Sequence, residues 1–235
     1  MDREAELNEF QRSFVMMSSH QLRTPLTVIK SDVDLLRLMC EDESAFDKNR
    51  MIRIADRMKT SVSRMTYLME DILTLGKLDA GAIEKRMTTI ELLESLDELI
   101  QNQFTPLATG RMLVIEFETD EIQIETDLDL LSQAIVNFIT NADKYSEGEK
   151  APVLTVRKEQ GFAIVEIKDF GIGIPKSDIA KLYHPFFRGS NAKDYRGTGL
   201  GLRIAKNFLD MIDSEVSIDS VENEGTTVVI KIPTA

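Results

Sequence analysis

This sequence of 235 residues has one cysteine, no tryptophan and no long apolar run. The single cysteine, Cys40, excludes a disulfide within the chain and a zinc site built on thiolates, and it favours a reducing, cytoplasmic compartment. No apolar run approaches the length of a membrane-spanning helix, and no signal peptide is recognisable. We therefore expect no membrane contact by this segment, which can still be the soluble part of a longer protein.

Basic residues are also fewer than acidic ones. The chain has 28 lysine and arginine residues against 40 aspartate and glutamate residues, so its net charge is −12. Such an acidic surface repels nucleic-acid backbones and anionic lipid headgroups, and we expect no nucleic-acid partner. A small bound nucleotide is compatible with this charge, because a local loop can still be electropositive.

Only two histidines occur, and one of them, His20, lies in a polar run at residues 18–26, Ser-Ser-His-Gln-Leu-Arg-Thr-Pro-Leu. Because Pro25 has no N–H, the carbonyl of Gln21 loses its helical partner, and we expect a kink beside His20. His20 and Thr24 are four residues apart and share one helix face. Taken alone, such a histidine is more often structural than functional.

Apolar residues at helical spacing predict two long helices that form a hairpin over residues ~5–80. The first helix carries two apolar stripes, and the second carries one main stripe flanked by Val62, Met69 and Leu73. The second helix begins at Asp47 and ends before Gly81, which suits a C-terminal cap. Each helix has more apolar surface than one partner covers, so we predict a homodimer in which two hairpins form a four-helix bundle. The alternative is a hairpin that packs on the C-terminal part of its own chain.

Past Gly81 the pattern changes to a mixture of helices and strands, so we predict two domains, 1–81 and 82–235. Helices are predicted at 90–104, 127–144 and 199–212, and strands at 113–117, 122–125, 153–157, 163–168, 215–219 and 226–232. The strands are expected to pair as antiparallel hairpins, the first around a turn at 119–121. This order predicts an α+β two-layer sandwich with helices on one face of the sheet.

Three segments of the second domain carry chemistry. In the first, Asn137, Asn141 and Lys144 lie at i, i+4 and i+7 and so share one helix face. Two amide oxygens and a lysine on one face suit a cluster of magnesium and phosphate, because magnesium prefers oxygen ligands and takes several of them from the phosphates. The alternative is a buried polar pair that bridges to a neighbouring loop.

The second segment, residues 168–175, follows a predicted strand. Its glycines allow tight turns and a close approach by a ligand. An ionised carboxylate only accepts hydrogen bonds, so Asp169 in a pocket would accept from the amino group of adenine and reject the carbonyl of guanine. The alternative is a simple turn after a strand.

The third segment, residues 196–202, is glycine-rich and runs into a helix, where backbone N–H groups and the helix dipole favour anions. It is not the Walker motif, because no Gly-Lys-Ser/Thr follows, and its third glycine comes one residue too early for the dinucleotide fingerprint.

Together and in this order, the three segments resemble the ATP-binding domain of bacterial sensor histidine kinases, which has the Bergerat (GHKL) ATPase fold. Residues 18–26 resemble the histidine box of the same family, and the resemblance covers about residues 10–232. It implies that His20 is the phosphorylated histidine and that Thr24 serves dephosphorylation of the partner protein. Asn137 and Asn141 match the magnesium-associated asparagines.

For the nucleotide site the resemblance implies a larger set. The cofactor-binding residues are Asn137, Asn141, Lys144, Tyr145, Asp169, Gly171, Gly173, Phe187, Arg188, Arg196, Gly197, Thr198, Gly199, Leu200 and Gly201. Residues ~174–198 resemble the mobile lid of the family, and Phe186 and Phe187 its phenylalanine box.

One residue departs from the family pattern. The position after the histidine is usually Glu or Asp, and here it is Gln21. A carboxylate accepts the imidazole proton, whereas an amide carbonyl orients the ring but cannot take a proton. This departure predicts a slow kinase step and makes Gln21 a third candidate catalytic residue beside His20 and Thr24.

The implied function is autophosphorylation of His20 with ATP and Mg²⁺, followed by transfer to an aspartate of a response-regulator receiver and by phosphatase activity on that regulator. Two alternatives stay open. One is a hydrolytic ATPase clamp of the same fold, which would need a glutamate at the position of Asn137. The other is a weakly active scaffold, favoured only by Gln21.

Overall fold

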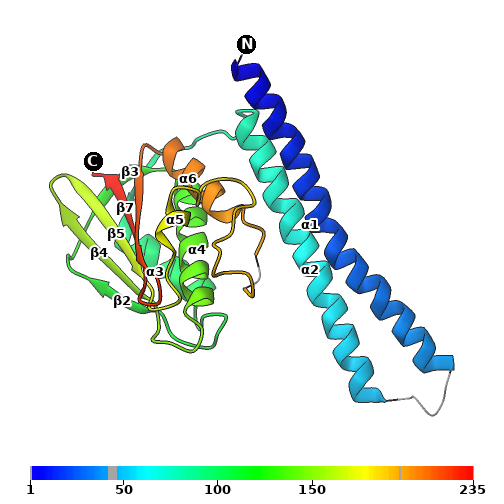
Figure 1. Ribbon diagram of the computed structural model, residues 1–235. Coiled ribbons are helices and arrows are strands. Elements are labelled where there is room, and N and C mark those ends of the chain that lie inside the picture. The colour runs from blue at the N-terminus through cyan, green and yellow to red at the C-terminus, as the bar shows by residue number, and fades with distance from the viewer. Residues whose placement is uncertain (1, 42–46, 196, 235) are drawn as a thin grey trace. The chain divides into compact units, whose positions relative to one another are not determined.

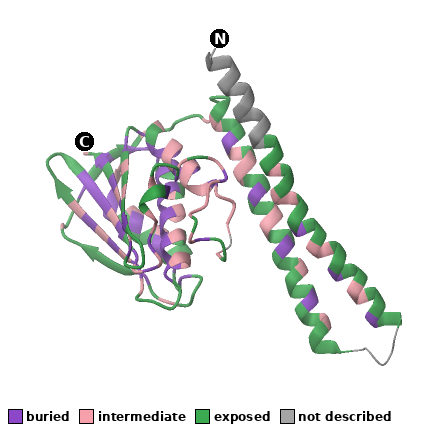
Figure 2. Cartoon of the chain, viewed as in Figure 1, coloured by how far each residue is buried: buried purple, intermediate pink, exposed green. Residues whose placement is uncertain are grey.

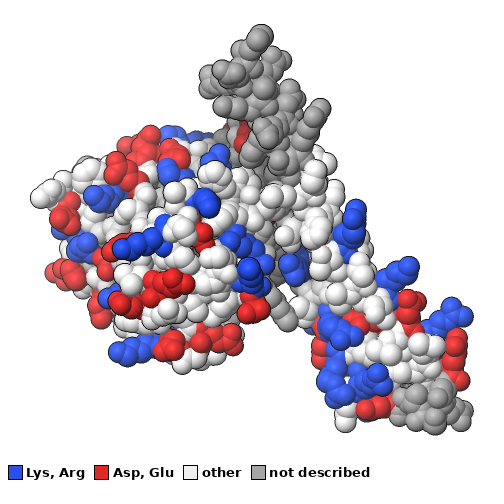
Figure 3. Space-filling model, in the orientation of Figure 1, with Lys and Arg blue, Asp and Glu red and all other residues white. Residues whose placement is uncertain are grey.

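The computed structural model describes residues 2–41, 47–195 and 197–234, and the side chains before Val15 lie outside the described set. The chain divides into two compact units, Met1–Gly76 and Lys77–Ala235. None of the helices in these ranges is long and apolar enough to cross a membrane. Figure 3 shows acidic and basic side chains interspersed on the visible surface of the second unit.

The first unit is a hairpin of two helices that lie side by side, α1 (Asp2–Glu41) and α2 (Lys48–Asp79) (Figure 1). The predicted hairpin is therefore confirmed. Asp47 begins α2, because its Oδ1 accepts hydrogen bonds from the N–H groups of Asn49 (2.9 Å) and Arg50 (3.1 Å). α1 continues through Pro25, so the proline does not end the helix.

The hairpin buries one line of side chains and leaves other apolar residues exposed (Figure 2). The buried apolar residues are Met39, Ile54, Leu68 and Leu75, and the exposed ones include Leu26, Val33, Val62, Met69 and Leu73. Between the helices, Asp32 is buried and accepts hydrogen bonds from Arg57, one of them from Nε to Oδ2 at 2.9 Å. These bonds lower the pKa of Asp32. Packing within one hairpin thus covers only part of its apolar surface.

The second unit is built on a five-stranded sheet in the order β2-β4-β5-β7-β6. Its strands are β2 (Val114–Phe117), β4 (Val153–Glu159), β5 (Phe162–Lys168), β6 (Glu215–Val221) and β7 (Gly225–Pro233). A separate ribbon joins β1 (Thr88–Glu91) to β3 (Gln123–Thr126). The helices are α3 (Leu92–Gln103), α4 (Leu128–Tyr145), the short α5 (Lys176–Ile179) and α6 (Gly201–Met211).

The helices lie on one side of this sheet (Figure 1), so the predicted two-layer α+β sandwich is confirmed. The core between the layers holds fully buried side chains from both, among them Phe138, Phe208, Leu154 and Ile167. Asp127 begins α4, because its Oδ1 accepts from the N–H groups of Asp129 (3.1 Å) and Leu130 (3.2 Å). This cap fixes the start of the helix that carries the first predicted chemical segment.

Two predictions from the sequence are wrong, one about the pairing of two strands and one about the start of a helix. The segments at 113–117 and 122–125 do not pair with each other, since β2 pairs with β4 in parallel and β3 pairs with β1 in antiparallel register. The helix predicted from Ile90 begins at Leu92, because Ile90 pairs with Ile124 in the β1–β3 ribbon. Apolar alternation reveals a strand but not its partner, and a strand as short as β1 has too few residues to show alternation.

Candidate functional site

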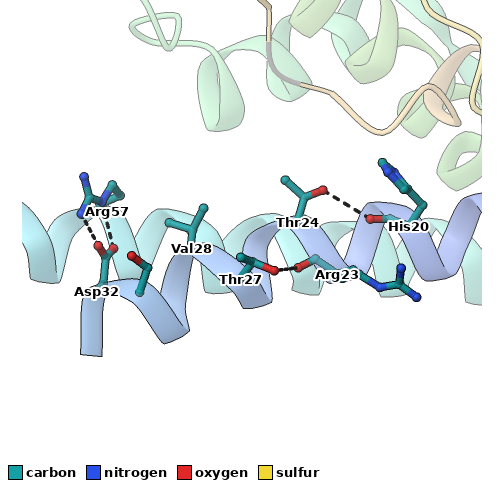
Figure 4. Close-up of a pocket in the computed structure, with 8 residues that line it drawn as sticks. His20, Arg23, Thr24, Thr27, Val28, Asp32 and Arg57 are labelled. Carbon is teal, nitrogen blue, oxygen red and sulfur yellow. Dashed lines mark hydrogen bonds and ion pairs between the residues drawn. The ribbon is translucent and has the colours of Figure 1, made fainter. Parts of the chain in front are cut away.

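His20 lies on the exposed surface of α1, at one end of an open pocket on the hairpin (Figure 4). The pocket has a volume of about 600 Å³ and is lined by His20, Arg23, Thr24, Thr27, Val28, Ser31, Asp32 and Arg57. The side chains of His20 and Thr24 project from the same side of α1, as their spacing predicts, and Thr24 Oγ1 donates to the carbonyl oxygen of His20 over 3.4 Å. A nucleophilic ring and a hydroxyl thus share one accessible face.

Gln21 has a different environment from its neighbour. Its side chain is half-buried, and its Oε1 accepts a hydrogen bond from Nη2 of Arg64 on α2 at 3.4 Å. The amide is therefore held by the other helix of the hairpin. An orienting contact from Gln21 to the His20 ring is absent from the hydrogen bonds of the described residues.

In the second unit, Asn137, Asn141 and Lys144 are half-buried on one face of α4. The glycine-rich third segment lies against this face. A Cβ atom placed on Gly201 would lie 2.5 Å from Oδ1 of Asn137, and one on Gly197 would lie 3.1 Å from Nζ of Lys144. The fold therefore brings together two of the three predicted segments, which lie more than fifty residues apart in the sequence.

Lys144 and Arg188 form a pair of neighbouring cations. Burial, and next the positive charge of Arg188, lower the pKa of Lys144 to about 8. Nζ of Lys144 lies 4.0 Å from the centre of the Tyr145 ring, which in turn contacts the Tyr195 ring at 5.1 Å. Within the described part of the chain, no carboxylate forms an ion pair with either cation. A bound anion would relieve their repulsion.

Arg188 has a second feature that suits an anion. Its Nη2 donates to the carbonyl oxygens of Ala192 (2.6 Å) and Tyr195, whereas its Nε is buried and has no partner among the described atoms. A buried N–H that lacks an acceptor is costly, and a ligand oxygen would satisfy it. The residues around α4 thus fit a polyanion such as a triphosphate.

Asp169 is buried at the end of β5. Its Oδ1 accepts from the N–H groups of Gly171 (2.9 Å) and Thr226 (3.2 Å). Burial raises the pKa of Asp169, while these two hydrogen bonds and the charge of Arg111 lower it. Among the described residues no group donates to Oδ2, so this oxygen is available to accept from a ligand.

Two glycines of the second segment are required by close backbone contacts. A Cβ atom on Gly171 would lie 2.0 Å from the carbonyl oxygen of Tyr145, and one on Gly173 would lie 2.0 Å from that of Val221. Gly199 has a φ of +75°, and its Cβ would lie 2.7 Å from the carbonyl carbon of Phe186. These contacts hold the second segment against the end of α4 and the third segment against residues 186–187.

The remaining predicted residues occupy varied positions. Thr198 Oγ1 accepts from the N–H of Leu200 over 3.3 Å, and the side chain of Leu200 is fully buried, so Leu200 can offer a ligand only its backbone. Phe187 is half-buried beside Phe186, which is buried. Arg196 lies outside the described residues. Across the described ranges, no group of three or more His, Cys, Asp or Glu side chains is placed to hold a metal ion.

Sequence reasoning missed Thr226 and Arg111. Thr226 supplies an N–H to Asp169, and its Oγ1 lies 2.9 Å from the hydroxyl of Ser220. Arg111 donates to the end of α4 and acts on Asp169 through its charge. Neither residue belongs to a motif, because Thr226 contributes through its backbone and Arg111 lies in an irregular stretch.

The chain matches two known domain families. Residues 10–81 match the His Kinase A (phospho-acceptor) domain, and residues 126–235 match the family described as Histidine kinase-, DNA gyrase B-, and HSP90-like ATPase. The sensor histidine kinase WalK of Bacillus subtilis is 32% identical over 234 residues, which are 97% of this chain and 37% of WalK. The chain therefore spans little more than a third of this relative.

Solved structures show the same fold. Histidine kinase ThkA, solved in complex with the response regulator protein TrrA, aligns with a TM-score of 0.71 at 20% identity, over 100% of this chain and 64% of ThkA. Full-length ShkA in complex with AMPPNP aligns with a TM-score of 0.66 at 20% identity, over 95% of this chain and 46% of ShkA. With a phospho-acceptor hairpin followed by an ATPase-like domain, this chain belongs to the sensor histidine kinase family.

Proposed function

We propose that this chain binds ATP and phosphorylates itself on His20. The observation that carries the proposal is the pair of unneutralised cations, Lys144 and Arg188, beside the glycines that close on α4. Among the described residues these two cations have no carboxylate partner and the buried Nε–H of Arg188 has no acceptor, so together they suit phosphate oxygens. The AMPPNP bound in the structural neighbour ShkA supports a nucleotide as the ligand.

Adenine recognition is assigned to Asp169. Its free oxygen is a hydrogen-bond acceptor, which suits the amino group of adenine and repels the carbonyl of guanine. Asn137 and Asn141 would hold Mg²⁺ through their amide oxygens, since Nδ2 of Asn137 already donates to the carbonyl of Gln133 at 3.1 Å. Bound Mg²⁺ would shield the negative charge of the phosphates.

His20 supplies the nucleophile. The unprotonated ring nitrogen attacks the γ-phosphorus in line, an N–P bond forms, and the bond to the bridging oxygen breaks so that ADP leaves, while the proton on the other ring nitrogen is released to solvent. The exposed ring is accessible for this attack, and catalysis rests on positioning and charge neutralisation more than on covalent chemistry. Asn137 supports transfer over hydrolysis, because an amide cannot activate water as a glutamate does.

The phosphoryl group is proposed to pass to an aspartate of a response-regulator receiver. The structural neighbour ThkA was solved with such a regulator, which supports this class of partner. Thr24 shares the exposed face of His20, so its hydroxyl is placed to orient water against a phospho-aspartate in the reverse, phosphatase reaction.

The hairpin is proposed to dimerise. Exposed apolar side chains recur along both helices, namely Leu26 and Val33 on α1 and Val62, Met69 and Leu73 on α2. A second hairpin would cover them and complete a four-helix bundle. Light scattering tests this directly, and a chain that is monomeric at micromolar concentration would contradict it.

The decisive experiment incubates the chain with γ-labelled ATP and Mg²⁺. We expect label on the protein that is lost in acid and retained in base, as for phosphohistidine, and no label on the His20→Ala variant. Steady release of phosphate without labelled protein would indicate a hydrolytic ATPase instead. A chain that fails to bind ATP would indicate a scaffold.

A further inference from the structure

Arg111 forms a dense hydrogen-bond network at the C-terminal end of α4. Its side chain is 18% exposed and pairs with the buried Asp143 on the last turn of α4, from Nη2 to Oδ1 at 2.8 Å. Thr109 completes the contact, because its N–H donates to Oδ2 of Asp143 at 3.1 Å and its hydroxyl accepts from Nε of Arg111 at 2.9 Å. This buried ion pair is thus satisfied on several sides.

The guanidinium also supplies donors that the helix lacks. The last carbonyl groups of an α-helix have no helical N–H partner. Arg111 donates to the carbonyl oxygens of Asp143 (2.7 Å) and Ser146 (2.7 Å), and to those of Glu149 (3.1 Å) and Lys150 (2.9 Å) in the loop that follows. A cation at a helix C-terminus is further favoured by the helix dipole.

The same helix end also contacts the turn that carries Asp169. The carbonyl oxygen of Tyr145 accepts from the N–H of Ile172 at 3.1 Å, and only a glycine at position 171 permits this approach. The last turn of α4 is therefore tied both to Arg111 and to the turn that carries Asp169. Lys144 belongs to this last turn, so the junction sets its distance from Asp169.

We infer that Arg111 is a positioning residue of the nucleotide site, which fixes Lys144 and Asp169 at the separation that a bound ATP requires. The inference rests on the proposed function, since it assigns these two residues to the phosphate and adenine ends of the nucleotide. The charge of Arg111 acts in the same direction, because it is the cation that favours the ionised form of the Asp169 carboxyl group.

The test compares autophosphorylation by the full chain carrying Arg111→Lys or Arg111→Gln with wild type. Arg111→Lys keeps the charge but cannot reach all four carbonyl groups, and Arg111→Gln loses the charge as well. We expect the KM for ATP to rise about threefold for Lys and about tenfold for Gln, with kcat at saturating ATP within about twofold of wild type. A purely structural defect would reduce the active fraction, and hence kcat, and would leave KM unchanged.

Arg157→Gln is the matched control. Arg157 is another partly exposed arginine in an ion pair, with Glu166 at 3.1 Å, but it lies on β4 away from α4. Its KM should equal that of wild type. If Arg111→Gln does not fold, as judged by circular dichroism, the Lys variant decides alone. Wild-type KM in the Arg111 variants, or a loss confined to kcat, would overturn the inference, whereas a wild-type chain that takes no label would overturn the proposed function itself.

Discussion

Arg64 on α2 reaches across the hairpin to Gln21 on α1, with Nη2 donating to Oε1 over 3.4 Å. Successive residues on a helix do not face the same way, so Gln21 is directed at α2 while the neighbouring His20 is exposed. The neutral amide does not balance the positive charge of Arg64, whereas a carboxylate at this position would form an ion pair with it. An acidic residue introduced at position 21 therefore has Arg64 as a partner that competes with His20.

This relationship changes the outcome expected for Gln21→Glu. On sequence grounds the new carboxylate assists His20, and general-base assistance contributes ~10²–10⁴-fold. Because Arg64 would pair with that carboxylate, we expect Gln21→Glu alone to change the initial rate of autophosphorylation by less than about threefold. The double variant Gln21→Glu with Arg64→Gln should be about tenfold faster than Arg64→Gln alone. This gain is smaller than the ~10²-fold low end of that range, because the added negative charge repels the incoming phosphate.

The rates are measured at saturating γ-labelled ATP. A double variant no faster than Arg64→Gln would show that a carboxylate beside His20 brings no advantage in this chain.

Asp169→Asn should weaken ATP binding. The substitution keeps one acceptor oxygen for the N–H groups of Gly171 and Thr226 but places an amide where the nucleotide needs an acceptor. A hydrogen bond to a charged group contributes about 1.5–3 kcal/mol, so the Kd should rise by roughly 10- to 100-fold. Calorimetry with the control Asp219→Asn, at an exposed position on β6, checks this, and an unchanged Kd would remove Asp169 from the site.

ATP affinity should depend on pH through Lys144. Below its pKa of about 8 the ammonium group is charged and attracts phosphate, and above that pH the free protein loses this charge. Affinity should therefore be flat up to about pH 7.5 and fall as the pH rises through 8, with proton uptake on binding. Lys144→Arg is the control, since arginine stays charged throughout this range and should bind ATP without the pH-dependent loss.

Calorimetry in two buffers of different ionisation enthalpy detects the proton uptake. Identical pH profiles for wild type and Lys144→Arg would show that Lys144 does not contact the phosphates.

Thr24→Ala should separate the two proposed activities. Its hydroxyl makes one long contact, 3.4 Å to the carbonyl of His20, so its removal costs the helix little. We expect autophosphorylation to be retained and dephosphorylation of the phosphorylated receiver to be lost. Thr27→Ala is a close control, because Thr27 lines the same pocket and its hydroxyl donates to the carbonyl of Arg23 in the same way, at 2.9 Å. An equal fall of both activities in Thr24→Ala would make the residue structural.

Periodicity identified most of the fold because most elements bury one face. The stripe of α4, for instance, includes Leu131, Ile135 and Phe138, which are fully buried, and the cap at Asp127 follows from its residue type. What periodicity could not supply is pairing between distant segments. The parallel neighbours β2 and β4 are separated by α4, and nothing in the local sequence of either strand marks the other.

For the candidate site, the sequence could indicate which side chains share a helix face. It could not indicate contacts made by backbone groups or by residues on another element. The face of Asn137 and Lys144 follows from helical spacing, whereas the contribution of Thr226 is an N–H that any residue but proline could supply. Gln21 shows the same limit, since its spacing places it next to His20 but only the hairpin reveals Arg64 as its partner. Contacts across elements require the fold.

The position of β7 in the sheet has a consequence for biosynthesis. This strand lies between β5 and β6, and its first residues also support Asp169, yet it is made only after the other strands of the unit. Until Pro233 has emerged from the ribosome, a nascent chain therefore lacks an interior strand of the sheet, and the proposed nucleotide site is incomplete. The hairpin, complete by Asp79, can form while synthesis continues, so the helix that carries His20 can fold before the second unit is complete.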